Sequence, residues 1–211
     1  MILKFDHISY SCDATTDVSQ HVPAHYKEIF RETDLDNIPC KIKYLQFNSS
    51  KHNIFMYESK NDDGADLPIE ITQYPQIAVG STPLRLEGRT IIWEVADAES
   101  ARKLFLCLGA QEETEKNKLR IVPFLDKTKI LIHFVENISC TRKPFLDISG
   151  FSSIGLFVDS VQKYLTKLSK AGFTVSGISP IEVHGKQMNI AFVEGRNGEL
   201  IELISMMKER K

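Results

Sequence analysis

The sequence predicts an α+β fold built from repeated modules, each of which runs strand, helix and about three strands, a βαβββ unit. The first observation is an internal repeat, because residues 93–110 align without a gap on residues 156–173. The second is that an apolar, strand-like run opens each copy, at 89–95 and at 152–158. The third is that several short apolar runs with strand character follow each copy.

The repeated segment predicts a helix in both copies. Asp97 and Ser160 are good N-cap residues, and Gly109 and Gly172 are good C-terminal stops. Between these ends, apolar residues recur at the spacing of one buried helical face. The matched positions are Ala98, Ala101, Phe105 and Leu108 in the earlier copy and Val161, Tyr164, Leu168 and Ala171 in the later copy. The strand-like runs that follow are 118–124 and 129–135 in the earlier copy and 174–178, 181–185, 188–194 and 200–205 in the later copy, some of which must merge.

The N-terminal part of the chain fits the same template more loosely. Residues 3–11 are predicted to be the opening strand, and residues 18–31 would supply the helix, starting near Pro23. The three strands of this unit are predicted at 40–47, 53–59 and 67–74. The chain therefore divides into three predicted modules, at residues 1–80, 87–137 and 148–207, of which the second is degenerate.

Composition narrows the class of protein. The chain has 211 residues and a formal net charge of −2 with both signs interspersed, so no basic stripe indicates a nucleic-acid partner. No apolar run approaches the length of a membrane span, and the N-terminus lacks a signal-peptide pattern. The four cysteines are widely spaced without a CxxC motif, which is typical of reduced thiols. We therefore expect a cytoplasmic protein with neither nucleic-acid nor membrane partners.

A single carboxylate stands inside the apolar run that closes the last module. Asn197-Gly198 is a turn signal, and Glu202 follows it between Ile201 and Leu203. A lone carboxylate in a buried strand costs several kcal/mol unless something pairs with it. Glu202 is therefore expected to face a metal, a substrate, a cationic side chain or backbone amides.

Several short motifs resemble the vicinal oxygen chelate superfamily, the group of glyoxalases, bleomycin-resistance proteins and extradiol dioxygenases. The motifs are DHISYSC at 6–12, GLFVDSV at 155–161 and NGELIELI at 197–204. The resemblance implies that paired βαβββ modules form cupped mixed sheets. It also implies metal ligands in the first and last strands of a module, typically a histidine in the first strand and a glutamate in the last.

When the ligand positions of the family are carried over one by one, the first module alone has both ligand types, as His7 and Glu70. In the middle module Thr90 stands at the histidine place, and the closing strand offers His133 at the carboxylate place. In the last module Glu202 stands at the glutamate place, and Ser153 stands at the histidine place. The implied metal ligands are His7, Glu70, His133 and Glu202, and the implied catalytic groups are Glu70 and Glu202.

Strand alternation supports part of this set. Successive side chains of a strand face opposite sides of the sheet. His7 and Ser9 would then face the concave side of the cup while Ile8 and Tyr10 face the helices, and Glu70 would also face the cup. Each of these residues also has a structural interpretation, since a strand histidine is often simply hydrogen-bonded and a carboxylate can pair with amides, lysine or arginine.

The resemblance implies a divalent metal, Fe, Mn, Ni or Zn, that binds a small molecule through two adjacent oxygens. With His133 the ligand set has two histidines and one carboxylate, which suits Fe(II) and oxygen chemistry. With Glu202 it has one histidine and two carboxylates, which resembles the isomerase and transferase branches. The resemblance implies an enzyme of the isomerase, lyase or dioxygenase type, and in the isomerase branch a metal-bound Glu70 or Glu202 would serve as the base.

Two questions stay open at this level. The absence of histidine at Thr90 and Ser153 equally indicates a metal-free protein that binds a small molecule or drug, as in the bleomycin-resistance branch, or a degenerate member kept for structure or partner binding. The number of modules raises the second question, since modules of this kind work in pairs and one of the three has no partner. Either the leftover module pairs across a homodimer, or the first and last modules form the cup and the middle one supports it.

Overall fold

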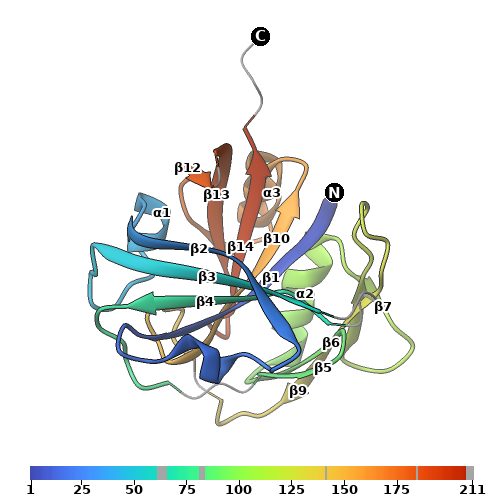
Figure 1. Ribbon diagram of the computed structural model, residues 1–211. Coiled ribbons are helices and arrows are strands. Elements are labelled where there is room, and N and C mark those ends of the chain that lie inside the picture. Colours follow the sequence, from blue (N-terminus) through green and yellow to red (C-terminus); the bar gives the residue numbers. More distant parts are fainter. Residues whose placement is uncertain (61–65, 81–83, 141, 184, 208–211) are drawn as a thin grey trace.

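The computed structural model describes residues 1–60, 66–80, 84–140, 142–183 and 185–207, and it contains two sheets (Figure 1). The strands of the large sheet run in the order β11-β13-β14-β10-β1-β4-β3-β2, with β12 paired to β13, and those of the second sheet in the order β5-β6-β9-β8-β7. The first unit comprises β1 (Ile2–Asp13), η1 (Val18–His21), β2 (Tyr26–Asp36), α1 (Pro39–Ile42), β3 (Lys51–Ser59) and β4 (Ile69–Tyr74). The middle unit comprises β5 (Leu84–Glu87), β6 (Thr90–Val95), α2 (Ala98–Leu108), β7 (Gln111–Glu112), β8 (Lys118–Ile121) and β9 (Ile130–Glu136). The last unit comprises β10 (Gly150–Val158), α3 (Val161–Lys170), β11 (Thr174–Val175), β12 (Ser179–Val183), β13 (Lys186–Glu194) and β14 (Leu200–Met206).

The predicted α+β fold of repeated modules is confirmed by the strand order, although the first unit has a short 3₁₀ turn in place of the helix after its opening strand. Within each unit the opening strand is flanked by the closing strand, and the two middle strands follow outward: β1-β4-β3-β2, β6-β9-β8-β7 and β10-β14-β13-β11. The opening strands β1 and β10 pair antiparallel, so the first and last units share one sheet. Of the two arrangements that the sequence left open, the structure has the one in which these two units form the cup.

Both predicted helices of the repeat are confirmed together with their ends. The side chain of Asp97 accepts a hydrogen bond from Ser100 N, and that of Ser160 accepts one from Lys163 N. Gly109 follows α2 with φ 108°, a left-handed conformation that glycine adopts without steric cost. The capping residues thus end both helices close to where the apolar repeat predicts.

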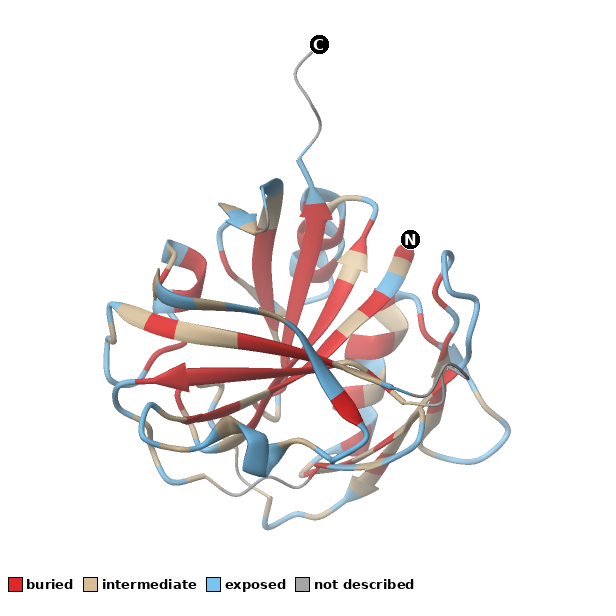
Figure 2. Ribbon diagram, viewed as in Figure 1, coloured by how far each residue is buried: buried red, intermediate tan, exposed pale blue. Residues whose placement is uncertain are grey.

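The helix predicted at 18–31 is wrong. Residues 18–21 form one short 3₁₀ turn, and Tyr26–Asp36 is the edge strand β2, which pairs with β3. Pro23 ends the first turn, and the residues after it place their charges in water, as an edge strand does. Figure 2 shows β2 largely exposed, whereas the central strands of the large sheet are buried.

The strand predicted at 40–47 is also wrong. Pro39 stands at the start of α1, where its fixed φ favours a helical turn and its missing N–H is not needed. Segment 39–47 then lies on the concave face of the large sheet, because Cys40, Tyr44 and Leu45 pack there with Phe192 and Ile204 of the last unit. The third strand of the first unit is β2 instead.

The middle unit covers the convex face of the large sheet. A shared core contains Ile8 of β1, Leu156 of β10, Phe105 of α2 and residues of the second sheet. The Trp93 ring of β6 meets the Phe151 ring of β10 edge to face, with centroids 4.9 Å apart. The middle module is therefore accommodated within one chain, against the sheet that the first and last units share.

No helix of the described residues has the length and apolarity needed to cross a membrane.

A buried carboxylate fixes segment 39–47 from the linker before the last unit. Asp147 is fully buried, and its two oxygens accept hydrogen bonds from Gln46 N at 2.8 Å and Phe47 N at 2.9 Å. Leu146 N donates to Tyr44 O at 2.8 Å. The turn after α1 is thus anchored to a distant part of the chain.

The Asp147→Ala variant should lower the free energy of unfolding by about 1–3 kcal/mol, because two partly buried backbone amides lose their acceptor. Urea denaturation measures the change, and Asp36→Ala, at an exposed carboxylate, is the control. A loss of under about 1 kcal/mol would show that water replaces the carboxylate at these amides.

Candidate functional site

Four neighbouring strands bring the site together across the centre of the large sheet. In the order β14-β10-β1-β4, Glu202 pairs with Gly155, Gly155 pairs with His7, and Ser9 pairs with Glu70. His7 is 2% exposed and Glu70 is 7% exposed. The first and last units thus contribute to one buried group of side chains, which lies on the concave face.

The alternation predicted for these strands is confirmed. Ile8 packs in the convex core, as do Ile201 and Leu203 on the closing strand of the last unit. The side chains between them, His7 and Glu202, line a cavity on the other face. The alternation of side chains along the two strands therefore determines which side chains meet in the cup.

The imidazole of His7 faces three carboxylates. Its Nδ1 lies 3.0 Å from Asp6 Oδ2, while its Nε2 lies 3.5 Å from Glu202 Oε2 and 3.9 Å from Glu70 Oε2. The Nε2 atom is buried and has no hydrogen-bond partner within the described structure. A buried ring nitrogen of this kind needs a proton shared with the carboxylates or a ligand.

Glu70 is held more firmly than Glu202. Its Oε1 accepts hydrogen bonds from Ser9 Oγ at 2.8 Å and from Thr72 Oγ1 at 2.9 Å, so its other oxygen is directed toward His7. The contact of Glu202 in this group is with His7. The two glutamates therefore differ in freedom, although they stand on equivalent closing strands.

Electrostatics within the group are dominated by burial and by mutual attraction. Burial lowers the pKa of His7, but the charge of Glu70, the hydrogen bond to Asp6 and the nearby carboxylate of Glu202 outweigh it and raise this pKa well above 6.5. Burial raises the pKa of the Glu70 carboxyl, but the charges of His7 and Lys41 and the two hydroxyl bonds outweigh it and lower this pKa. Without a ligand, both shifts favour a protonated imidazole between carboxylates.

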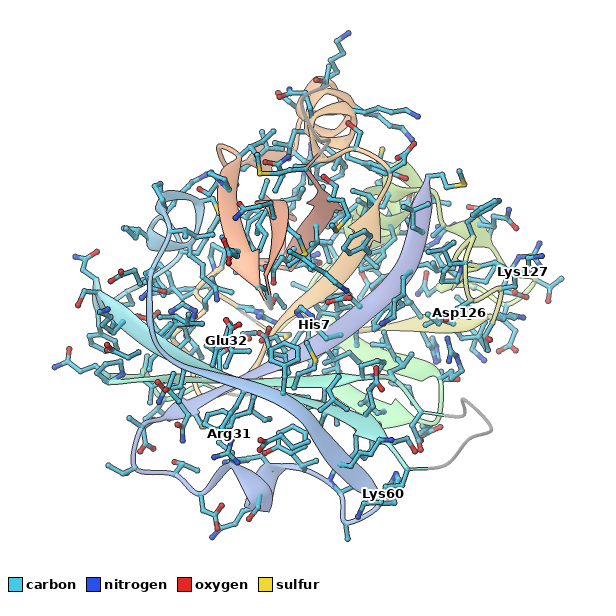
Figure 3. The ribbon with its side chains drawn as sticks, turned by 45° about the horizontal axis from the view of Figure 1, so that its top comes forward. His7, Arg31, Glu32, Lys60, Asp126 and Lys127 are labelled. Carbon is cyan, nitrogen blue, oxygen red and sulfur yellow. The ribbon has the colours of Figure 1, made fainter. Side chains whose placement is uncertain are left out.

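A cavity of about 240 Å³ opens onto this group, and it adjoins a wider groove of about 540 Å³ that shares Asp6, Phe30 and Met188 with it. Figure 3 shows His7 near the middle of the molecule, where β1 passes β10, and Glu32 of β2 lines the same cavity. The walls are mostly apolar and include Phe30, Ile54, Met56, Ile181, Met188 and Ile204. The cavity can hold a small molecule with an apolar body and a polar end.

The structure adds residues that the sequence did not single out, Lys41 and His52. Both are buried, both line the cavity, and Lys41 Nζ lies 3.1 Å from His52 Nε2. The strand predicted at 40–47 gives Lys41 no place in the cup, whereas the helical turn that forms there brings it into the cavity. Pro39 was the signal that could have revealed the turn.

His133 is not brought to this group. It lies on β9 of the second sheet, half-buried, between Ile132 and Phe134, which pack in the convex core. Its side chain therefore points to the opposite face of that sheet. Of the four ligands that the resemblance implied, the structure gathers three: His7, Glu70 and Glu202.

Those three side chains have the donor chemistry of a metal site, one imidazole nitrogen and two carboxylates. In their present positions the three side chains are not close enough to hold a metal ion, and no other group of three or more His, Cys, Asp or Glu side chains in the described ranges is. Binding would require the carboxylates to draw closer to Nε2, and Glu202 has the freedom to do so. The unpartnered Nε2 is the feature that fits a metal.

No protein-family model matches the chain, and no curated protein matches it. Solved structures do. A methylmalonyl-CoA epimerase shares 13% identity over 99% of this chain and 98% of that chain, with a TM-score of 0.42. The fosfomycin resistance protein FosX from Mesorhizobium loti shares 14% identity over 58% and 95%, with a TM-score of 0.39. A V278E mutant of glyoxalase I from Zea mays shares 13% identity over 95% and 67%, also at 0.39.

All three likenesses are under 25% identical and have TM-scores under 0.5. Their identities and TM-scores are too low to carry an argument about activity. What this chain does has to be argued from its own site.

Gly155 gives a test of how closely the site is packed. A Cβ at this position would lie 2.5 Å from His7 Cε1 and 2.7 Å from each ring nitrogen. Gly155→Ala should displace the imidazole and lower the free energy of unfolding by about 1–3 kcal/mol, as overpacking does. Denaturation and the NMR signals of the His7 ring measure both effects. Gly177→Ala is the matched control, because a Cβ there meets nothing within 4 Å. Unchanged His7 signals in Gly155→Ala would contradict the packing.

The raised pKa of His7 predicts a pH dependence of the metal-free protein. A group whose pKa rises on folding stabilises the folded state fully below its unfolded value, near 6.5, and loses that contribution as the pH rises through the folded value. The free energy of unfolding should therefore fall from pH 6 toward alkaline pH, and less steeply in His7→Gln. An NMR titration of His7 with a midpoint at or below 6.5 would show that the carboxylates do not hold the proton.

Proposed function

We propose that this glyoxalase-like protein binds a divalent metal through His7, Glu70 and Glu202, and that it is an enzyme acting on a small molecule that chelates through two adjacent oxygens. The observation that carries the proposal is the buried, unpartnered Nε2 of His7, which faces two carboxylates at the inner end of a cavity. The proposal extends to these residues what the sequence resemblance implied.

Three protein ligands leave coordination positions for water and substrate oxygens, which is the arrangement of catalytic sites. Because His133 lies elsewhere, the set has one histidine and two carboxylates. This set favours Zn, Ni or Mn and the isomerase and transferase branches over the two-histidine set of Fe(II) oxygenases. When bound, the metal would supply Lewis-acid stabilisation of a developing oxyanion.

Residues of this chain supply the other roles: anchoring a ligand, moving a proton and orienting His7. Ser9 and Thr72 hold one oxygen of Glu70, so Glu70 is the anchored carboxylate. Glu202 lacks such hydroxyl partners among the described residues and is the better candidate for a base that moves a proton at its Oε2. Asp6 orients the His7 ring through Nδ1, which fixes the nitrogen that faces the cavity.

A metal-free binding protein is the second candidate, and one observation favours it. His7 already lies within ion-pair distance of Asp6 and Glu202, so these side chains have charged partners without a metal. The apolar walls would then sequester a small molecule or drug. A homodimer is a further prediction, for which sedimentation velocity is the test.

The metal content of protein purified without an affinity tag separates the two candidates. Plasma mass spectrometry should find nearly one metal ion per chain, and His7→Ala, Glu70→Ala and Glu202→Ala should each remove it. His133→Ala is the matched control and should retain the metal. Binding of Zn²⁺ should also release a proton near pH 7, because His7 must lose its proton to become a ligand. Absence of metal after incubation with Fe, Mn, Ni and Zn would reject the metal site and leave the binding protein.

A further inference from the structure

A buried ammonium shares the cavity with the carboxylates. Lys41 is 8% exposed, and its polar contact among the described residues is with His52 Nε2, at 3.1 Å. An ammonium group has three N–H donors. Two of them therefore remain for whatever occupies the cavity that Lys41 lines.

The third N–H donor of Lys41 is taken up by His52. Burial and the charge of Lys41 lower the pKa of His52 to about 2, so its ring is neutral and its Nε2 accepts the hydrogen bond. The ring stacks on Tyr74, with centroids 5.8 Å apart and planes 21° apart. The partner of Lys41 is thus an uncharged, fixed acceptor, which orients the ammonium without neutralising it.

The acidic groups of the cavity do not neutralise Lys41 directly. The charge of Lys41 acts on Glu70, yet no ion pair within 4.0 Å joins Lys41 to a carboxylate in the described ranges. At the rim, Asp36 pairs with Lys51 at 2.9 Å and Glu182 accepts a hydrogen bond from Gln187. The ammonium of Lys41 therefore has no carboxylate within ion-pair distance among the described residues, and burying a charge is costly unless it is paired.

The position of Lys41 is fixed before any ligand arrives. Cys40 N donates to Ser179 Oγ at 3.1 Å, and Asp147 holds the following turn at Gln46 and Phe47. Segment 39–47 is thus tied to the last unit before Lys41 and to the linker preceding that unit after Lys41. A group held in this way loses little further freedom when it binds a ligand.

We propose that Lys41 is a substrate-binding residue that takes a carboxylate, so that the ligand is a small carboxylic acid with an apolar body. The inference rests on the proposed function in placing the ligand in this cavity. The ligand's charged oxygen lies on Lys41, its neighbouring oxygens face His7, Glu70 and Glu202, and its apolar part packs on the wall formed by Phe30, Met56 and Met188.

Isothermal titration with benzoate and with benzamide, its uncharged analogue, tests the subsite in the full chain, both metal-free and saturated with Zn²⁺. Benzoate should bind at least about tenfold more tightly than benzamide in one of the two states, as expected of a charge-assisted hydrogen bond. Lys41→Met, which keeps the length of the side chain, should abolish this preference and leave benzamide binding unchanged. Lys43→Met is the control on the same segment, because Lys43 lies outside the cavity lining and contacts Tyr44.

Thermal unfolding of each variant shows whether it is folded, and Lys41→Arg, which keeps the charge, should retain the preference if Lys41→Met does not fold. Equal affinity for benzoate and benzamide, or a preference that survives Lys41→Met, overturns the subsite. The two proposals fail separately. Bound metal without a benzoate preference rejects the subsite alone, whereas a preference lost in Lys41→Met without any bound metal rejects the metal site alone.

Discussion

The antiparallel pairing of β1 with β10 is the constraint on which the site depends. It fuses two βαβββ units into one sheet and sets His7 opposite Gly155, which in turn neighbours Glu202. A slip of one residue in this register would turn the side chains of β10 and β14 over relative to those of β1, and would so separate His7 from Glu202. Gly155 contributes to the same constraint, because the imidazole lies where any side chain at that position would have to be. The chemistry of the cup therefore follows from a backbone pairing between strands that are far apart in the sequence.

The buried charges are poor candidates for a stabilising device. Removing ions from water costs more than their attraction commonly returns, and a buried ion pair is often replaceable by apolar residues of similar volume without loss of stability. Here His7, Asp6, Glu70 and Glu202 stand together at the end of a cavity, and Lys41 stands beside them with two donors to spare. Their arrangement is better explained by what the cavity binds than by the stability of the sheet.

The repeat with its caps was predictable from the sequence, because helix ends and apolar periodicity are local signals; Asp97, Ser160 and Gly109 are examples. Strand alternation placed His7 and Glu70 on one face for the same reason. The pairing of units was not predictable, since it depends on contacts between β1 and β10 that no local pattern encodes. His133 matched a motif position but lies in the other sheet, which shows that motif alignment without the pairing cannot assign ligands.

The two errors in the first unit have one physical cause. A helix at 18–31 would have covered the convex face of β1, but Phe105 and Trp93 of the middle unit already share a core with Ile8 on that face. The chain before β2 can then be short, and residues 26–36 become the edge strand. The chain leaving β2 lies on the concave side, where Pro39 turns it and Asp147 anchors it. Placing the middle unit on one face thus leaves segment 39–47 for the other, and that segment carries Lys41 into the cavity.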